Sequence, residues 1–169
     1  MAYIPFNLII FPLLNDELIQ HGGTGRLEIL FTYFPGQLFS QLSALGNSGR
    51  RTYLIGIIAV EFVYPLIYSL FLAFMLTMLG HKAFKEESPL RRTQLFPFAM
   101  LVFHYISNIS LIVLLSSYPA QPIGIAWIAS AANTLKWCFG AFSLLAMFAA
   151  LLIVLVRFTR QKTSQGASQ

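Results

Sequence analysis

Charged residues are scarce in this chain, because Asp, Glu, Lys and Arg together make up only 10% of its 169 residues. An ordinary soluble domain has about 25%, so the chain has too little charge to cover a surface that faces water. Hydrophobic residues make up 57%, against about 45–50% in a soluble domain. These two departures exclude a water-soluble globular protein and favour one whose solvent is lipid.

Cysteine is scarce as well. Cys138 is the single cysteine, so a disulfide within the chain is excluded. No second histidine or cysteine is placed to complete a metal site with His104. The sequence also lacks a P-loop, a dinucleotide fingerprint, an HExxH motif and a GxSxG motif. We therefore predict no metal site, and no cofactor is identified.

The formal net charge is +5, but the basic residues do not resemble a nucleic-acid-binding surface. They gather at the ends of apolar runs, at Lys82, Lys85, Arg91, Arg92, Arg157, Arg160 and Lys162. This placement is typical of the cytoplasmic ends of membrane helices, and no nucleic-acid-binding motif accompanies it. We expect the C-terminus to be cytoplasmic and the bilayer, not nucleic acid, to be the main partner.

The apolar runs predict the membrane segments. A full span needs about 20 apolar residues, which are present in residues 53–79, 95–115 and 123–158. Residues 2–14 form a shorter run that Pro5 and Pro12 interrupt, so we expect a partial first helix there. We predict one transmembrane domain over residues 1–158 and a disordered polar tail over residues 159–169.

A short amphipathic helix is predicted over residues 35–45. Pro35 suits the first turn of a helix, and Gly46 suits its end. One face of this helix carries Leu38, Phe39, Leu42 and Leu45. We expect it to lie on the outer membrane surface or to cap the bundle. The predicted fold is thus an all-α transmembrane bundle with three full spans, a partial N-terminal one and this short outer helix.

Three ionisable residues, Glu61, His104 and Lys136, fall inside the predicted spans. A charge in lipid costs about 2.5–3.5 kcal/mol on insertion scales, and by default it marks a functional position. At a rise of about 1.5 Å per residue, all three lie in the outer half of the membrane or near its midplane. Their depths are compatible with one shared cluster.

Helical spacing indicates which polar residues accompany these three. Residues three and four apart share a face, and the polar stripes carry Glu61 with Tyr68, His104 with Asn108, and Asn133 with Lys136. Since lipid satisfies no polar group, the stripes are expected to face inward. We predict an ion pair between Glu61 and Lys136, bridged or flanked by Asn108, His104 and Tyr68, with Asn133 in the same cluster.

Three interpretations of this cluster stay open. It holds the bundle together, with contacts worth roughly 0.6 kcal/mol each; it binds a ligand, an ion or a proton; or it faces another membrane subunit. We favour a non-enzymatic accessory or binding protein, with a membrane-protein partner or a second copy of the chain. One alternative is a lipid-modifying or isomerase-like enzyme with Glu61 and His104 as acid and base. Another is a proton or small-solute path in an oligomer.

Several segments resemble a family of small uncharacterised four-helix bacterial membrane proteins. Residues 33–35 (Tyr-Phe-Pro), 42–46 (Leu-Ser-Ala-Leu-Gly) and 49–54 (Gly-Arg-Arg-Thr-Tyr-Leu) are similar to its outer-loop signature. Residues 61–68 resemble its next helix, where an acid precedes a Pro and a Tyr. The similarity covers roughly residues 30–160. It implies a bundle in the bacterial inner membrane and the position of the polar site, but no established activity.

The chain departs from that family in two respects. Family members tend to carry acidic residues where this chain has His104 and Ser107, which argues against acid-dependent chemistry. The family also has a complete first helix, whereas residues 2–14 correspond only to its end. We therefore expect the chain to begin inside that helix.

Overall fold

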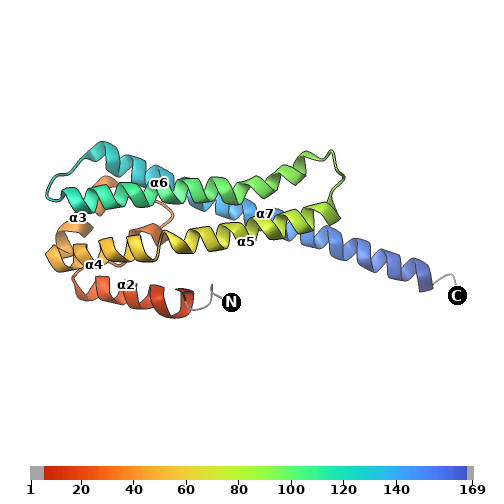
Figure 1. Cartoon of the computed structure of the whole chain (residues 1–169), viewed down its shortest axis with the longest axis horizontal. Coiled ribbons are helices and arrows are strands. Elements are labelled where there is room, and N and C mark those ends of the chain that lie inside the picture. The colour runs from red at the N-terminus through yellow and green to blue at the C-terminus, as the bar shows by residue number, and fades with distance from the viewer. Residues whose placement is uncertain (1–5, 167–169) are drawn as a thin grey trace.

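The computed structural model describes residues 6–166, with side chains through residue 160, and this part of the chain is helical without a β-strand. The elements in chain order are the π-helical turn η1 (Phe6–Ile10), α2 (Phe11–Gln20), the 3₁₀ turn η2 (Leu27–Ile29), α3 (Pro35–Ala44), α4 (Gly46–Ala59), α5 (Val63–Ala83), the 3₁₀ segment η3 (Pro89–Leu95), α6 (Phe96–Ser117) and α7 (Ile123–Gly166). Figure 1 shows the long helices lying side by side along one axis. The predicted all-α bundle is confirmed.

In the part of the chain that the structure describes, three segments are long and apolar enough to cross a membrane, namely Gly46–Ala83, Pro89–Ser117 and Ile123–Arg160. They contain the three full spans that the sequence predicts. Large apolar side chains project from their outer faces, and Phe71, Phe74 and Phe148 are each more than half exposed. Such a surface suits contact with acyl chains and not with water.

The first of these segments differs from the prediction. The sequence predicts one helix over residues 53–79, but the structure has two helices, α4 and α5, separated at residues 60–62. Pro65 explains the separation, because proline has no N–H and its ring clashes with the carbonyl four residues earlier. That carbonyl belongs to Glu61, so the one carboxylic acid of the predicted cluster lies in the break itself.

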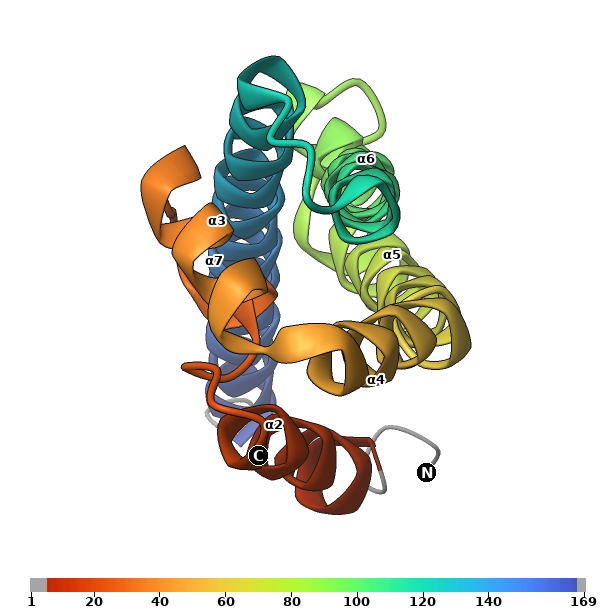
Figure 2. The ribbon, with the colours of Figure 1, turned by 90° about the vertical axis from the view of Figure 1, so that its left-hand side faces the viewer.

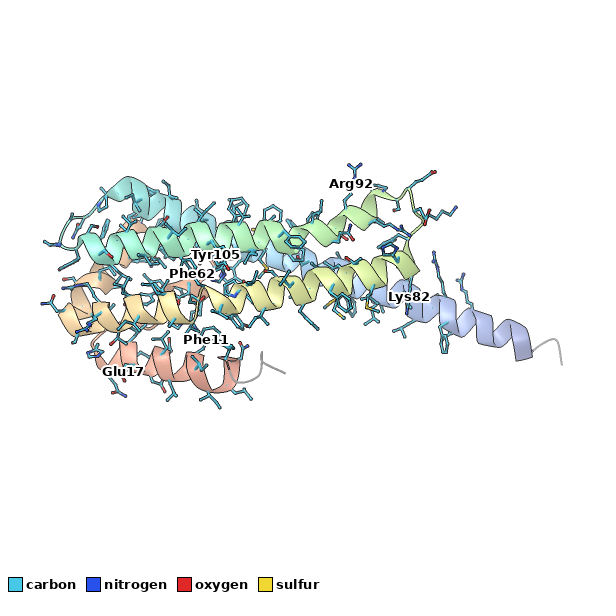
Figure 3. All side chains as sticks on the ribbon, in the orientation of Figure 1. Phe11, Glu17, Phe62, Lys82, Arg92 and Tyr105 are labelled. Carbon is cyan, nitrogen blue, oxygen red and sulfur yellow. The ribbon has the colours of Figure 1, made fainter. Side chains whose placement is uncertain are left out.

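Helix α6 satisfies the backbone groups that the break exposes. Asn108 donates from Nδ2 to the Glu61 carbonyl at 2.8 Å, and Tyr105 donates its hydroxyl to the Phe62 carbonyl at 2.8 Å. The rings of Tyr105 and Phe62 also stack, with centroids 5.3 Å apart, and Figure 3 labels both at the middle of the bundle. Non-helical backbone at membrane depth needs such protein partners.

The two ends of the chain are more helical than predicted. The partial first helix, expected over residues 2–14, runs through α2 to Gln20, because no proline or glycine intervenes until Gly22. Gly22 has φ 88°, a conformation that favours glycine and ends the helix. Residues 2–5 lie outside the described residues. Likewise α7 continues through Gly166, so the tail predicted to be disordered from residue 159 is helical that far, and residues 167–169 lie outside the described part.

The predicted amphipathic helix is present as α3, and its apolar face is buried against protein. Leu38, Leu42 and Leu45 are at most 1% exposed, and α3 contacts both α7 and α4. In Figure 2, which views the bundle end-on, α3 lies over the near end of α7. Of the two placements predicted for this helix, the structure has the one in which the helix caps the bundle. We call residues 21–45, the loop before α3 with α3 itself, the cap.

The helix break supplies a first prediction. We expect Asn108→Leu to lower the free energy of unfolding by about 1–3 kcal/mol, because it leaves the buried Glu61 carbonyl without its donor. Pro65→Ala restores a backbone N–H that can bond to the same carbonyl. Asn108→Leu should therefore cost less in the Pro65→Ala background, by at least about 0.5 kcal/mol. Reversible unfolding of the four proteins in mixed micelles measures this coupling, and additive losses would contradict it.

Candidate functional site

The loop of the cap folds into the bundle instead of staying on its surface. Arg26, Leu27, Glu28 and Tyr33 are all buried, with exposures of 7%, 2%, 2% and 0%. Helical side chains satisfy its backbone: Asn15 Oδ1 accepts from the Arg26 N–H at 3.1 Å, and the Tyr53 hydroxyl accepts from the Leu27 N–H at 2.9 Å. A buried loop requires such partners for its peptide groups.

Arg26 lies at the centre of the buried charges. Its Nη2 donates to Glu61 Oε1, and its Nε donates to Glu28 Oε1 at 2.8 Å. The guanidinium carbon also lies 4.0 Å from the centroid of the Phe11 ring, a cation–π contact that joins the loop to α2. Burial opposes the charge, but the carboxylates of Glu28 and Glu61 outweigh it, so the pKa of Arg26 is raised above its ordinary value.

A row of hydrogen bonds continues from Glu61 toward the outside of the bundle. His104 Nε2 lies 2.9 Å from Glu61 Oε2, and the Tyr68 hydroxyl lies 3.0 Å from His104 Nδ1. With a neutral ring protonated at Nε2, His104 donates to the carboxylate and accepts the hydroxyl proton of Tyr68. Glu61 and His104 are 1% and 5% exposed, whereas Tyr68 is only partly buried.

Lys136 joins the cluster by a different contact from the predicted one. Its Nζ donates to the backbone carbonyl of Glu28 at 2.9 Å, and Trp137 Nε1 reaches the same carbonyl at 3.3 Å. Within the described residues, the ion-pair partners of Glu61 are Arg26 and His104. The predicted Glu61–Lys136 pair is therefore wrong, because Arg26 of the infolded loop occupies the place beside Glu61.

The cluster balances its own charge. Two cations, Arg26 and Lys136, are buried with two anions, Glu28 and Glu61. Both oxygens of each carboxylate are bonded, since Tyr53 donates its hydroxyl to Glu28 Oε2. Buried charges are tolerated when they are paired and hydrogen-bonded in this way. No group of three or more His, Cys, Asp or Glu residues in the described part of the chain is arranged to hold a metal.

The structure brings four of the six predicted site residues into direct contact, namely Glu61, Tyr68, His104 and Asn108. Lys136 is linked to them through Glu28 and Arg26. Asn133, the sixth, is fully buried and donates from Nδ2 to the Leu30 carbonyl at 2.6 Å. It lies on the same face of α7 as Lys136 and fixes the next part of the loop.

Sequence reasoning missed Arg26 and Glu28, and it also missed the burial of two tyrosines. Tyr33 and Tyr53 are fully buried, and burial raises the pKa of Tyr33. A signal for the loop was present: the chain has few charges, and two of them flank Leu27 before an apolar run. Three nearby glycines, at positions 22, 23 and 25, allow the chain to turn inward there.

Comparisons of the chain with models of protein families, with curated proteins and with solved structures find no match. The resemblance to small four-helix bacterial membrane proteins therefore stays a prediction. What is known of the site comes from its own geometry: a charge-balanced network in which α2, α4, Glu61 and α7 hold an infolded loop.

The Arg26–Glu61 pair supplies a second prediction. Arg26→Gln and Glu61→Gln each leave an uncompensated buried charge, so each should lower the free energy of unfolding by about 3–5 kcal/mol. The double variant should lose less than the sum of the two. The matched cycle of Lys136→Met with Glu61→Gln should show a smaller coupling, because Lys136 bonds a carbonyl and not the Glu61 carboxylate.

Denaturant titration of both sets of variants in the same micelles gives the two coupling energies. A coupling for Lys136 with Glu61 that exceeds the one for Arg26 with Glu61 would reinstate the pair predicted from the sequence.

Proposed function

We propose that this chain is a multi-pass protein of a bacterial inner membrane that acts by binding another membrane protein, as an accessory subunit, and not by catalysing a reaction. The observation that carries this proposal is that the two groups suited to acid–base chemistry are fully bonded to the protein. Both oxygens of Glu61 and both ring nitrogens of His104 have protein partners. Neither residue presents a free atom to a substrate, which supports a role in holding a shape.

The length of the helices supports a placement in the membrane. Arg157 Nη1 donates to the Lys82 carbonyl at 2.9 Å, so the two basic residues lie at one level, as expected at a cytoplasmic boundary. A hydrocarbon core of about 30 Å corresponds to roughly 20 helical residues above that level. This distance reaches Phe62, just before α5, and Trp137 on α7, where aromatic side chains suit the outer boundary.

By the same measure, the cap lies at the outer headgroups and beyond. Asn133, which holds the Leu30 carbonyl, lies about 36 Å above Arg157. Around it, apolar side chains point outward, each between 44% and 61% exposed: Ile29, Leu30, Phe31, Phe34 and Trp127. We call these five residues the outer strip. An apolar strip outside the hydrocarbon core is typical of a protein-binding surface, and the buried charges hold the loop that carries it.

A proton relay is the second candidate function, and one observation favours it. The row from Tyr68 through His104 to Glu61 is continuous, and Tyr68 at its end is a partly buried residue. Such rows move protons when one end meets water. Proton flux into liposomes that contain the protein, abolished in His104→Gln, would replace the accessory role with this one.

The orientation gives a third prediction. In a Cys138→Ser background, we expect a membrane-impermeant maleimide to label Gln121→Cys on intact spheroplasts, because this residue lies exposed in the turn between α6 and α7. Glu87→Cys, in the basic loop at the opposite end, should react only after the membrane is permeabilised. The opposite labelling pattern would place the C-terminus outside.

The accessory role gives a fourth prediction. A photoreactive phenylalanine at Phe31 or Phe34 should cross-link to one polypeptide of constant mass, present in near-equal amount in the gently extracted complex. The matched control is Phe71, which is 58% exposed on α5 and should cross-link to lipid. Arg26→Gln should weaken the cross-links from the outer strip, since it releases the loop. Identical adducts from Phe31 and Phe71 would contradict the proposal.

A further inference from the structure

A groove lies between α5 and α7 at the end of the bundle opposite the cap. Its volume is about 370 Å³, within the range of about 300–1,000 Å³ that ligand pockets occupy. Met75, Met78 and Leu79 line it from α5, and Met147, Phe148 and Leu151 line it from α7. Lys82 is its one charged lining residue, and Figure 3 labels it near the end of α5.

We propose that this groove binds an anionic phospholipid, with an acyl chain between α5 and α7 and the phosphate at Lys82. The lining explains the acyl chain. All six residues other than Lys82 are apolar, and three of them are methionines, whose flexible thioethers adapt to irregular apolar partners. Met78, Phe148 and Leu151 are 44%, 60% and 41% exposed, so the groove opens on the side that faces lipid.

The charges at this end explain the phosphate. Arg157 contacts the Lys82 carbonyl, and Lys85 and Arg160 are exposed nearby in sequence. The opposing carboxylates are those of Glu86 and Glu87 in the loop that follows, yet within the described residues no carboxylate lies within ion-pair distance of Lys82. Its ammonium is thus available to an anion.

The level of Lys82 agrees with this ligand. In the membrane placement proposed above, on which this inference rests, Lys82 lies at the cytoplasmic boundary, where phospholipid phosphates lie. The cytoplasmic leaflet carries anionic lipids that attract basic residues beside a membrane helix. An anionic phospholipid therefore fits the groove and the cation at the same time. The inference does not depend on the accessory role of the cap.

The test is native mass spectrometry of the whole purified chain with dioleoyl phosphatidylglycerol and dioleoyl phosphatidylcholine, which share their acyl chains. We expect at least about fivefold tighter binding of the anionic lipid. Lys82→Gln should remove most of this preference, whereas Arg51→Gln, which neutralises an exposed cation at the cap end, should preserve it. Met78→Trp should fill the groove and weaken binding of both lipids, whereas Leu145→Trp, at a 65% exposed position outside the groove, should not.

Four results would overturn the inference. Equal binding of the two lipids, or equal effects of Lys82→Gln and Arg51→Gln, would remove the phosphate contact. Displacement of the lipid by glycerol phosphate alone, with no effect of Met78→Trp, would leave a surface anion site without the groove. A dimer that Met78→Trp dissociates would make the groove a contact between copies of the chain. If the cysteine-labelling prediction for Gln121→Cys and Glu87→Cys fails while the preference for the anionic lipid holds, only the proposed orientation is lost.

Discussion

The ion pair between Arg26 and Glu61 joins a loop to a break in a membrane helix, and the half of the molecule that carries the cap is arranged around it. Breaking a buried pair of this kind costs about 3–5 kcal/mol, a large part of the 5–15 kcal/mol that usually separates folded from unfolded protein. Without Glu61, the loop has no anion from the helices to compensate Arg26. Without Arg26, the Glu61 carboxylate keeps His104 as its partner.

The break itself is part of the same arrangement. Pro65 removes a backbone donor, and the carbonyl it releases is that of Glu61. Asn108 then binds the carbonyl while His104, one turn earlier on α6, binds the carboxylate. Glu61 thus contacts two side chains of α6, one at its backbone carbonyl and one at its carboxylate. Because of the break, Glu61 can bond both to side chains of α6 and to Arg26 in the loop of the cap.

Much of this architecture follows from sequence patterns. The rest could not be predicted from them, and the reason is physical. Apolar runs and helical spacing report on residues that lie in helices, so they located the spans, α3 and the inward polar stripes. They carry no information on a loop that folds back. The contacts of Arg26 and Glu28 join residues 35 and 108 positions apart. Hydropathy alone predicts that both residues lie on a solvated surface. The predicted Lys136 partner was wrong because the competing cation came from this loop.

The separation of these contacts along the chain has a consequence for biosynthesis. Lys136, Trp137 and Asn133 bind carbonyls of the loop about 100 residues earlier, and all three belong to the last helix. While the ribosome is still making α7, the loop lacks these donors, although its contacts with Asn15, Tyr53 and Glu61 can already form. The cap therefore acquires its final shape only after residues 133–137 have left the ribosome. Until then, an unfinished chain differs from a finished one in the structure of its cap.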